Sequence, residues 1–229
     1  MKRIIFALMC VAVFTGTSSG REYPAIGMCT ANYVRYRDEP GTDSNILGRI
    51  HEYNDVIVLG EKRYKGDKWY RIENPADEGE AWVSGQYIDI YEFDNVPKNV
   101  YAVKVKMVQT FGVNPEKARV LLGKPERTKT EKFYFEPAGE NLKGETLQYD
   151  GCKIYYVEGS LSSIEVTNSN YGFGDIYVGD SKQMVIDTMG KPESENEDFL
   201  SYRITDLESI DFTFRDDKVI SMTWEHYMD

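Results

Sequence analysis

Short runs of alternating apolar and polar residues fill the chain from about residue 28 to residue 90. Runs such as YVRYR, ILGRI, VIVLGEKR and KWYRIE are separated by clusters such as DEPGTDSN and NPADEGE. Alternation with a period of two residues predicts β-strands, and Gly, Pro, Asp and Asn clusters predict the turns between them. The pattern therefore predicts a small all-β barrel, which we place at residues 21–92.

A polar, proline-bearing connection, FDNVPKN at residues 93–99, is interpreted as the boundary of this domain. The next segment, YAVKVKM, again alternates apolar and polar residues, and this alternation predicts an extended strand. We therefore assign residues 93–112 to a linker and entry strand, and residues 113–229 to a second domain.

The second domain contains one pattern twice. LLGKPERTK at residues 121–129 returns as TMGKPESEN at residues 188–196, at an offset of 67. Asn114 and Ser181 precede the copies as candidate N-caps, because their side-chain oxygens can accept a hydrogen bond from a free backbone amide. Each Gly-Lys-Pro then supplies a glycine to end a helix and a proline that cannot continue it. The motif lacks the upstream glycine and the hydroxyl residue of a phosphate-binding loop, so it predicts a helix end.

A hairpin pattern also repeats, because IYYVEGSLSSIEV at residues 154–166 aligns with FTFRDDKVISMTW at residues 212–224. The offset here is 58, so the first copy carries nine extra residues, which we place near GENLKGE at residues 139–145. With one further strand before each hairpin, the sequence predicts an α+β domain made of two helix-then-three-strand antiparallel repeats. The copies span about residues 113–168 and 176–226.

Strand parity divides the two predicted hairpins into two faces. One parity should face the helices, and it contains Ile154, Tyr156, Ile164, Val166, Phe212, Phe214, Met222 and Trp224. The other mixes tyrosine with charged residues, a composition that suits protein contact. The candidate partner-binding residues are Tyr134, Tyr155, Glu165, Asp211, Thr213 and Arg215, although the face occupied by Tyr134 depends on a register that stays open. The alternative is that this face is only solvated.

Charge excludes one class of partner. The 229 residues include 27 Lys plus Arg against 38 Asp plus Glu, a formal net charge of −11. A field of this sign repels phosphate backbones and anionic lipid headgroups, so nucleic acid is not expected as a partner.

The first twenty residues predict export. Lys2 and Arg3 precede the apolar run Ile4–Phe14 and a stretch of small residues, which together form the pattern of a signal peptide at residues 1–20. The run is shorter than the about 20 residues that span a bilayer, so no membrane-spanning segment is expected. Cys10 lies inside the run behind Met9, which argues against a lipoprotein anchor. We expect a periplasmic or extracellular protein.

Candidate catalytic groups are few. The chain has only two histidines, His51 and His226, and after the signal only two cysteines, Cys29 and Cys152. The spacing neither pairs a thiol with a histidine nor provides a set of zinc ligands. Carboxylates are abundant, so a glycosidase with two catalytic carboxylates stays open by counting alone, but most of the 38 acidic residues are expected to lie on the surface. We therefore expect no enzyme activity, no metal and no cofactor. A disulfide between Cys29 and Cys152 and two separate thiols both stay open.

The order of motifs in the first domain resembles the bacterial SH3-like domain family. The matching motifs are Val34-Arg35, Pro40-Gly41-Thr42, Ile46-Leu47-Gly48, Val56 to Gly60, Lys68 to Ile72 and Ala81-Trp82-Val83 to Tyr87-Ile88. One departure is Ala81, where the family usually has glycine before the tryptophan. The resemblance implies a binding module of exported proteins, which in this family is often associated with cell-wall peptides or with a neighbouring catalytic domain. Tyr36, Arg37, Asp38 and Trp69 are the candidate ligand-binding residues, with core packing of the aromatic side chains as the alternative.

The second domain resembles the β-lactamase-inhibitor-protein-like family and the SmpA/OmlA-type lipoproteins. The resemblance is carried by the helix, the Gly-Lys-Pro and the strands ending at Trp224. It implies a non-catalytic domain that holds another protein on a sheet face. Two hypotheses follow: a binding protein for wall peptide or an envelope protein, and an inhibitor or regulator of a secreted enzyme such as a wall hydrolase or a β-lactamase.

Overall fold

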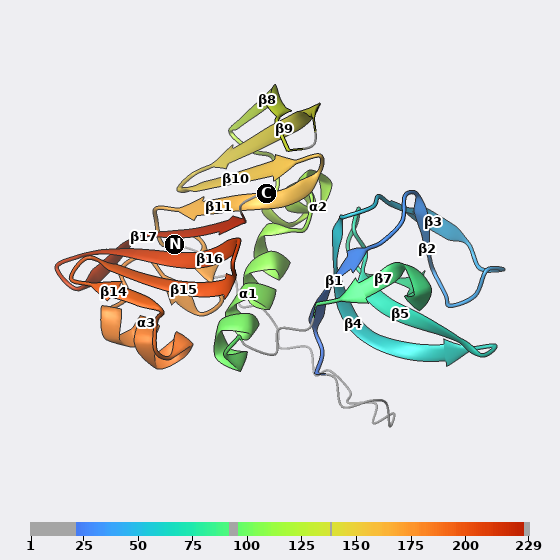
Figure 1. Cartoon of the computed structure of the whole chain (residues 1–229), viewed down its shortest axis with the longest axis horizontal. Coiled ribbons are helices and arrows are strands. Elements are labelled where there is room, and N and C mark those ends of the chain that lie inside the picture. Colours follow the sequence, from blue (N-terminus) through green and yellow to red (C-terminus); the bar gives the residue numbers. More distant parts are fainter. Residues whose placement is uncertain (1–21, 92–95, 138, 227–229) are drawn as a thin grey trace, which may run out of the picture.

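The computed structural model describes residues 22–91, 96–137 and 139–226 (Figure 1). The predicted signal peptide, residues 1–20, and the start of the predicted linker lie outside the described residues. The described chain forms a β-barrel and a second domain dominated by one large sheet, with a long helix between them (Figure 1).

The predicted all-β domain is confirmed. Its strands are β1 (Ala25–Cys29), β2 (Val34–Arg37), β3 (Ile46–Ile50), β4 (Asp55–Tyr64), β5 (Asp67–Glu73), β6 (Glu80–Ser84) and β7 (Ile88–Ile90), in the sheet order β3-β2-β6-β5-β4-β1-β7. A short 3₁₀ turn, Gly85–Tyr87, precedes β7. Tyr36 packs across Gly48, where a Cβ atom would lie 2.3 Å from the phenol oxygen. Glycine at this position therefore lets a large aromatic side chain close the barrel core.

The predicted entry strand is wrong, because residues Lys98–Phe111 form the helix α1. Val100, Val103, Met107 and Phe111 recur at the spacing of one helix face and all four are buried. The alternation in YAVKVKM covers too few residues to separate this spacing from a period of two.

The predicted helix ends are confirmed in α2 (Pro115–Leu122) and α3 (Lys182–Met189). The Asn114 side chain accepts a hydrogen bond from the Lys117 amide, and the Ser181 hydroxyl accepts one from the Met184 amide. The C-caps are Gly123 at φ 79° and Gly190 at φ 83°. Glycine adopts this left-handed region without steric cost, so both Gly-Lys-Pro motifs end a helix.

The second domain is built on an eight-stranded antiparallel sheet. Its order is β14 (Ser194–Asn196), β15 (Phe199–Thr205), β16 (Glu208–Arg215), β17 (Lys218–His226), β11 (Ser160–Val166), β10 (Cys152–Val157), β9 (Glu140–Tyr149) and β8 (Arg127–Phe135). A separate small pair, β12 (Gly172–Phe173) and β13 (Ile176–Tyr177), lies between the halves in sequence. Four strands of this sheet follow each of α2 and α3, one more than predicted, and β11 and β17 pair at the centre.

Corresponding contacts recur in the two halves of the sheet. The Tyr149 hydroxyl donates to the Gly123 carbonyl at 3.3 Å, and the Tyr202 hydroxyl donates to the Gly190 carbonyl at 3.0 Å. The halves differ in their hairpins, since β8 and β9 are long strands whereas β14 has three residues. The stretch at residues 139–145, where the sequence predicted an insertion, lies mostly in β9.

Helix α1 connects the barrel and the sheet. Its buried residues share one hydrophobic core with the inner face of the sheet and with Ile26 and Ile57 of the barrel. Direct hydrogen bonds also cross the junction: the Tyr101 hydroxyl accepts from the Ile26 amide at 2.9 Å, and the Lys117 ammonium donates to the Asp77 carbonyl at 2.7 Å. Residues 98–111 of the segment assigned as a linker therefore form the helix on which both domains pack.

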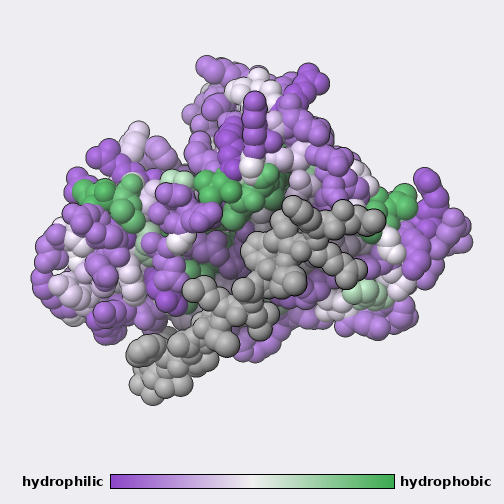
Figure 2. Space-filling view, turned by 180° about the vertical axis from the view of Figure 1, so that it is seen from behind, coloured by the Kyte–Doolittle hydropathy of each residue, from purple (hydrophilic) through white to green (hydrophobic). Residues whose placement is uncertain are grey.

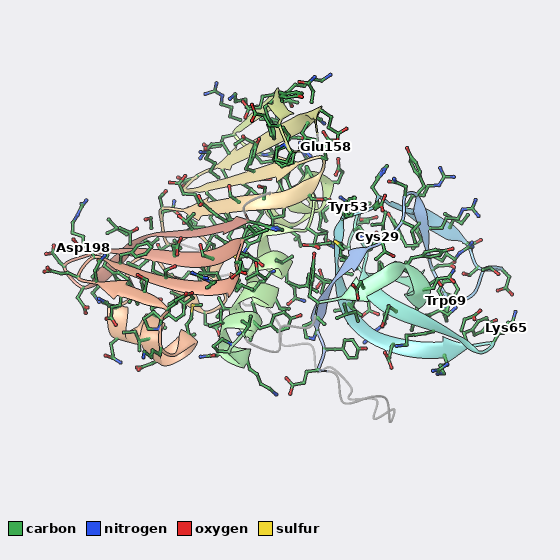
Figure 3. The ribbon with its side chains drawn as sticks, viewed as in Figure 1. Cys29, Tyr53, Lys65, Trp69, Glu158 and Asp198 are labelled. Carbon is green, nitrogen blue, oxygen red and sulfur yellow. The ribbon has the colours of Figure 1, made fainter. Side chains whose placement is uncertain are left out.

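A second contact between the domains lies at the β10–β11 turn. The Asn54 side chain donates to the Ser160 hydroxyl at 2.7 Å. In Figure 3, Tyr53 on the barrel and Glu158 at this turn lie on the sides of the two domains that face each other. The barrel thus contacts the sheet domain at α1 and at the first-half hairpin.

Candidate functional site

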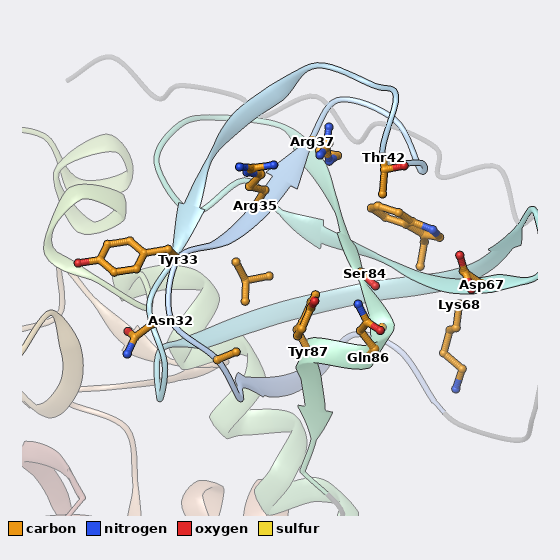
Figure 4. A pocket seen from close by; sticks show the side chains of 14 residues that line it. Asn32, Tyr33, Arg35, Arg37, Thr42, Asp67, Lys68, Ser84, Gln86 and Tyr87 are labelled. Atoms are coloured by element: carbon orange, nitrogen blue, oxygen red, sulfur yellow. The ribbon is translucent and has the colours of Figure 1, made fainter.

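An open groove of about 750 Å³ crosses the barrel surface (Figure 4). We call it the barrel groove, and it is lined by residues 31–35, 37, 42, 67–69 and 84–87. These residues come from the β1–β2 turn, β2, the β2–β3 loop, β5, the end of β6 and the 3₁₀ turn. Its volume lies in the range typical of small-ligand sites, about 300–1,000 Å³.

Aromatic rings border the barrel groove. Tyr33 is 62% exposed and Tyr87 38% exposed, while Trp69 is only 4% exposed and contributes to the wall of the groove. The backbone of Tyr33 has φ 60°, a conformation uncommon for a residue with a side chain. Its ring rests edge-on against the ring of His51, with centroids 4.8 Å apart. This conformation holds an amphipathic ring at one end of the groove (Figure 4).

Arginine side chains supply the charge of the groove. Arg35 and Arg37 lie on one face of β2, and Arg35 stands directly opposite Arg49 of β3. Arg37 is buried and donates to the Ser44 carbonyl at 2.5 Å. Within the described residues, the side chains of Arg35 and Arg49 form no ion pair or hydrogen bond. Two unneutralised like charges face each other across the strands, an arrangement that costs stability.

The predicted ligand residues divide between the groove and other roles. Arg37 and Trp69 line the groove, although Trp69 is buried and not half-exposed as expected, whereas Tyr36 and Asp38 do not line it. Tyr36 points inward and is 4% exposed, because alternate residues of a strand face opposite sides. The Asp38 carboxylate accepts from the backbone amide of Asn45 at 3.0 Å and from its side-chain amide at 2.7 Å. Asp38 thus closes the β2–β3 loop.

Other groove residues were not among the sequence candidates, notably Tyr33, Arg35, Lys68 and Tyr87. The alternation of side chains along β2 was a usable signal for Arg35. Tyr36 points to one face of the strand, so Arg35 and Arg37 on either side of it point to the opposite face. No comparable local signal indicates Tyr33, Lys68 or Tyr87, which lie on segments that only the fold brings together.

The predicted partner surface is one polar face of the large sheet. Cross-strand pairing places Lys153, Glu165, Thr223 and Asp211 in one row across four strands on this face. On the opposite face, the residues predicted to face the helices are all buried. We call this the open face, and it contains Lys153, Tyr155, Ser163, Glu165, Asp211, Thr213 and Thr223. Arg215 has the same parity at the end of β16, beside the turn.

Tyr134 lies on the other side of the sheet. It shares the parity of Thr128, whose partner Leu147 is buried in the core. Tyr134 is exposed because the β8–β9 hairpin extends beyond the core at that end. The structure therefore removes Tyr134 from the open face.

Two features flatten and order the open face. Tyr155 packs over Gly144, where a Cβ atom would lie 2.4 Å from the phenol oxygen. The Asp211 carboxylate accepts hydrogen bonds from Ser201 at 2.5 Å and from Ser209 at 3.1 Å.

Seen from behind, the molecule shows small, separate hydrophobic patches on a mainly hydrophilic surface (Figure 2).

The cysteines are two separate buried thiols. Burial raises the pKa of the Cys29 thiol, which donates to the Ala31 carbonyl at 3.2 Å. Burial, with a smaller effect of Glu165, raises the pKa of Cys152 to about 12. A reactive thiolate needs a lowered pKa, so both environments act against it. Among the described residues, no group of His, Cys, Asp and Glu is arranged to hold a metal ion.

Comparison with known proteins finds a family model that matches most of the barrel. Residues 32–89 match the family model of the bacterial SH3 domain, so the barrel is a bacterial SH3 domain. No curated protein matches the chain. None of the helices in the described part of the chain has the length and apolar character needed to cross a bilayer.

Two solved structures are similar to parts of the chain. An extracellular protein containing an SCP domain from Bacillus anthracis str. Ames is 10% identical, with 52% of this chain and 45% of that chain covered and a TM-score of 0.31. A proposed β-lactamase inhibitor protein from Streptococcus mutans is 14% identical, with 50% of this chain and 83% of that chain covered and a TM-score of 0.21. This chain thus aligns with less than half of the length of the Bacillus protein. Both TM-scores are too low for either likeness to define fold or function.

Proposed function

We propose that this is an exported, non-catalytic binding protein that recognises cell-wall peptide, or a peptide segment of an envelope protein, in the barrel groove. The observation that carries the proposal is the open, aromatic-bordered groove on a bacterial SH3 domain. Export is supported by the signal pattern of residues 1–20. Tyrosine and tryptophan suit such a site because they offer contact area at a small cost in conformational entropy.

The non-catalytic role is supported by the surroundings of the candidate nucleophiles. Cys29 and Cys152 are buried with raised pKa values, in separate domains. His51 packs against the Tyr33 ring instead of a thiol. These groups are suited to packing, whereas the groove residues are suited to holding a ligand.

Sedimentation with purified cell walls tests this proposal. The protein should be retained on isolated peptidoglycan, and substitution of Tyr33 and Tyr87 by alanine should reduce retention about tenfold or more, since each exposed ring contributes contact area. Replacing the exposed Tyr177, which lies outside the groove, should leave retention unchanged. Failure of the native protein to bind walls or any envelope protein would overturn the proposal.

A second candidate function uses the open face. We propose that α2 with β8–β11 and α3 with β14–β17 are two copies of one duplicated unit, which together present this face to a secreted enzyme as an inhibitor or regulator. The matching Tyr149 and Tyr202 hydrogen bonds and the central β11–β17 pairing support the duplication. The flat packing of Tyr155 over Gly144 supports a contact surface for a protein.

Enzyme assays separate this candidate from the first. Activities of a panel of wall hydrolases and β-lactamases should fall when the protein is added. Replacing Tyr155 and Glu165 by alanine should relieve the inhibition, whereas replacing Tyr33 should not. Unchanged activity across the panel would remove this second candidate and leave the groove proposal intact.

A further inference from the structure

The barrel groove carries a local positive charge in an acidic chain. The formal net charge of the chain is −11, yet three cationic residues, Arg35, Arg37 and Lys68, line the groove against one acid, Asp67. Asp67 lies at the far end of the groove from Arg35 (Figure 4). The field inside the groove therefore has the opposite sign to that of the chain as a whole.

The cations of the groove differ in how far neighbouring acids neutralise them. The Lys68 ammonium lies 3.6 Å from the Glu61 carboxylate and 3.4 Å from the Tyr70 hydroxyl, so its charge is already balanced. Near Arg37, the Asp43 carboxylate is ion-paired with Lys65 at 3.1 Å. The guanidinium of Arg37 reaches only the neutral Ser44 carbonyl. The unbalanced positive charge of the groove therefore resides on the two arginines.

Arg49 strengthens this local charge. It stands opposite Arg35 across β2 and β3, and within the described residues no acid pairs with either side chain. A bound anion would relieve the repulsion between them and would gain charge-assisted hydrogen bonds from planar guanidinium groups, which match a carboxylate in geometry.

We propose that the barrel groove binds its peptide through a free carboxylate group, held by Arg35 and Arg37 between the rings of Tyr33 and Tyr87. This inference rests on the proposed function and specifies the chemistry of its ligand. The aromatic borders favour a peptide over a simple anion, because an exposed tyrosine ring contacts apolar and backbone groups next to the carboxylate. A wall stem peptide and the acidic segment of a protein both offer this chemistry.

Calorimetric titration with matched peptides tests the carboxylate. The probes are a wall stem tetrapeptide with free carboxylates, the same peptide with every carboxylate amidated, and a linear peptide of alanine and glutamate of equal length. The free form should bind at least about tenfold more tightly than the amidated form, because hydrogen bonds between a guanidinium and a charged carboxylate are about twice as strong as those between neutral groups. Tighter binding of the stem peptide than of the linear peptide would identify the wall as the source, and the reverse order would identify an acidic protein segment.

Variants of the full chain locate the contact. Arg35→Gln should weaken binding of the free form about tenfold or more, to nearly the affinity of the amidated form, and Arg35→Lys should give an intermediate loss because it keeps the charge but not the planar fork. Arg63→Gln is the matched control, since Arg63 is an exposed barrel arginine outside the groove lining. Unchanged thermal unfolding of Arg35→Gln would show that the variant folds.

The outcomes separate this inference from the proposed function. Equal affinity for the free and amidated peptides, or full affinity in Arg35→Gln, would overturn the carboxylate contact and leave the binding function standing. Retention of the protein on walls without binding of any of the three peptides would likewise overturn the carboxylate contact and leave the wall-binding function standing. Failure to bind both the walls and the peptides would overturn the inference and the wall-binding function together.

Discussion

The ammonium group of Lys104 lies 2.5 Å from a carboxylate oxygen of Glu208 in the interior between α1 and the sheet. The two side chains are 5% and 4% exposed. The same carboxylate oxygen accepts a hydrogen bond from the Trp224 indole at 2.7 Å. Glu208 begins β16 and Trp224 lies on β17, so one carboxylate joins α1 to the second half of the sheet.

Removing one charge of this buried pair should strongly destabilise the fold. Lys104→Met leaves the Glu208 carboxylate without its counter-charge in the interior, and the expected loss is about 3–5 kcal/mol in the free energy of unfolding. Urea denaturation followed by tryptophan fluorescence measures this loss. Lys106→Met is the control on the same helix, because Lys106 forms an exposed ion pair with Asp175 and should cost about 1 kcal/mol or less. Similar losses in both variants would show that burial of the pair has no special role.

Asp55 should make stability depend on pH. Burial of its carboxyl group, opposed by Lys104 and by the Tyr91 hydroxyl at 3.1 Å, raises its pKa from 3.8 to about 6. Between these two values the folded chain binds more protons than the unfolded chain, so the contribution of Asp55 to stability falls as pH rises. Asp55→Asn should therefore gain stability relative to the native protein as pH increases from about 4 to about 7.

Urea denaturation of both proteins across this pH range measures the difference. Asp89→Asn is a control, because Asp89 is an exposed acid of the same barrel. A difference between Asp55→Asn and the native protein that does not change with pH would contradict the prediction.

The hydroxyl groups of Tyr149 and Tyr202, which bond to the C-cap carbonyls of α2 and α3, should contribute equally to the free energy of unfolding. Tyr149→Phe and Tyr202→Phe each remove one hydrogen bond to a C-cap carbonyl and keep the ring, so each should lower the free energy of unfolding by about 1 kcal/mol. Tyr177→Phe, at an exposed ring, should have almost no effect. Measured values far apart for Tyr149 and Tyr202 would argue against equivalent roles in the two halves.

The barrel and the sheet domain should unfold together. Ile26 and Ile57 of the barrel share a core with α1, so neither domain can unfold without exposing apolar surface of the other. Barrel signals from Trp69 and Trp82 and sheet signals from Trp224 should therefore follow one transition in urea. The three single-tryptophan proteins provide this measurement, and separate midpoints would show that the domains are independent.

Local signals in the sequence predicted much of this fold. The N-caps at Asn114 and Ser181 and the glycines at 123 and 190 depend on a few neighbouring residues, and both helices end as expected. Strand parity predicted correctly that Ile154, Phe212 and their equivalents are buried. It could not resolve α1, because seven residues of alternation also fit one helix face.

The candidate site was less accessible from sequence. Arg37 and Trp69 were predicted, but Tyr33 and Tyr87 come from turns that only the closed barrel brings to one groove. Likewise, nothing local distinguishes Lys104 from the exposed Lys106, since its burial depends on where the sheet lies. Tertiary packing, which no short window of sequence contains, determines these positions.

The shared helix α1 fixes the geometry of any complex that this protein forms. On a flexible tether, a ligand in the barrel groove would explore many positions, and the length of the tether would set its effective concentration near the sheet. In this protein the barrel packs against α1 and forms a hydrogen bond to the β10–β11 turn, so direct contacts hold the two domains together. The barrel groove and the open face are therefore held at a fixed distance and a fixed relative orientation. A partner that contacts both surfaces must match this geometry, so the shape of the partner contributes to selectivity in addition to the individual contacts.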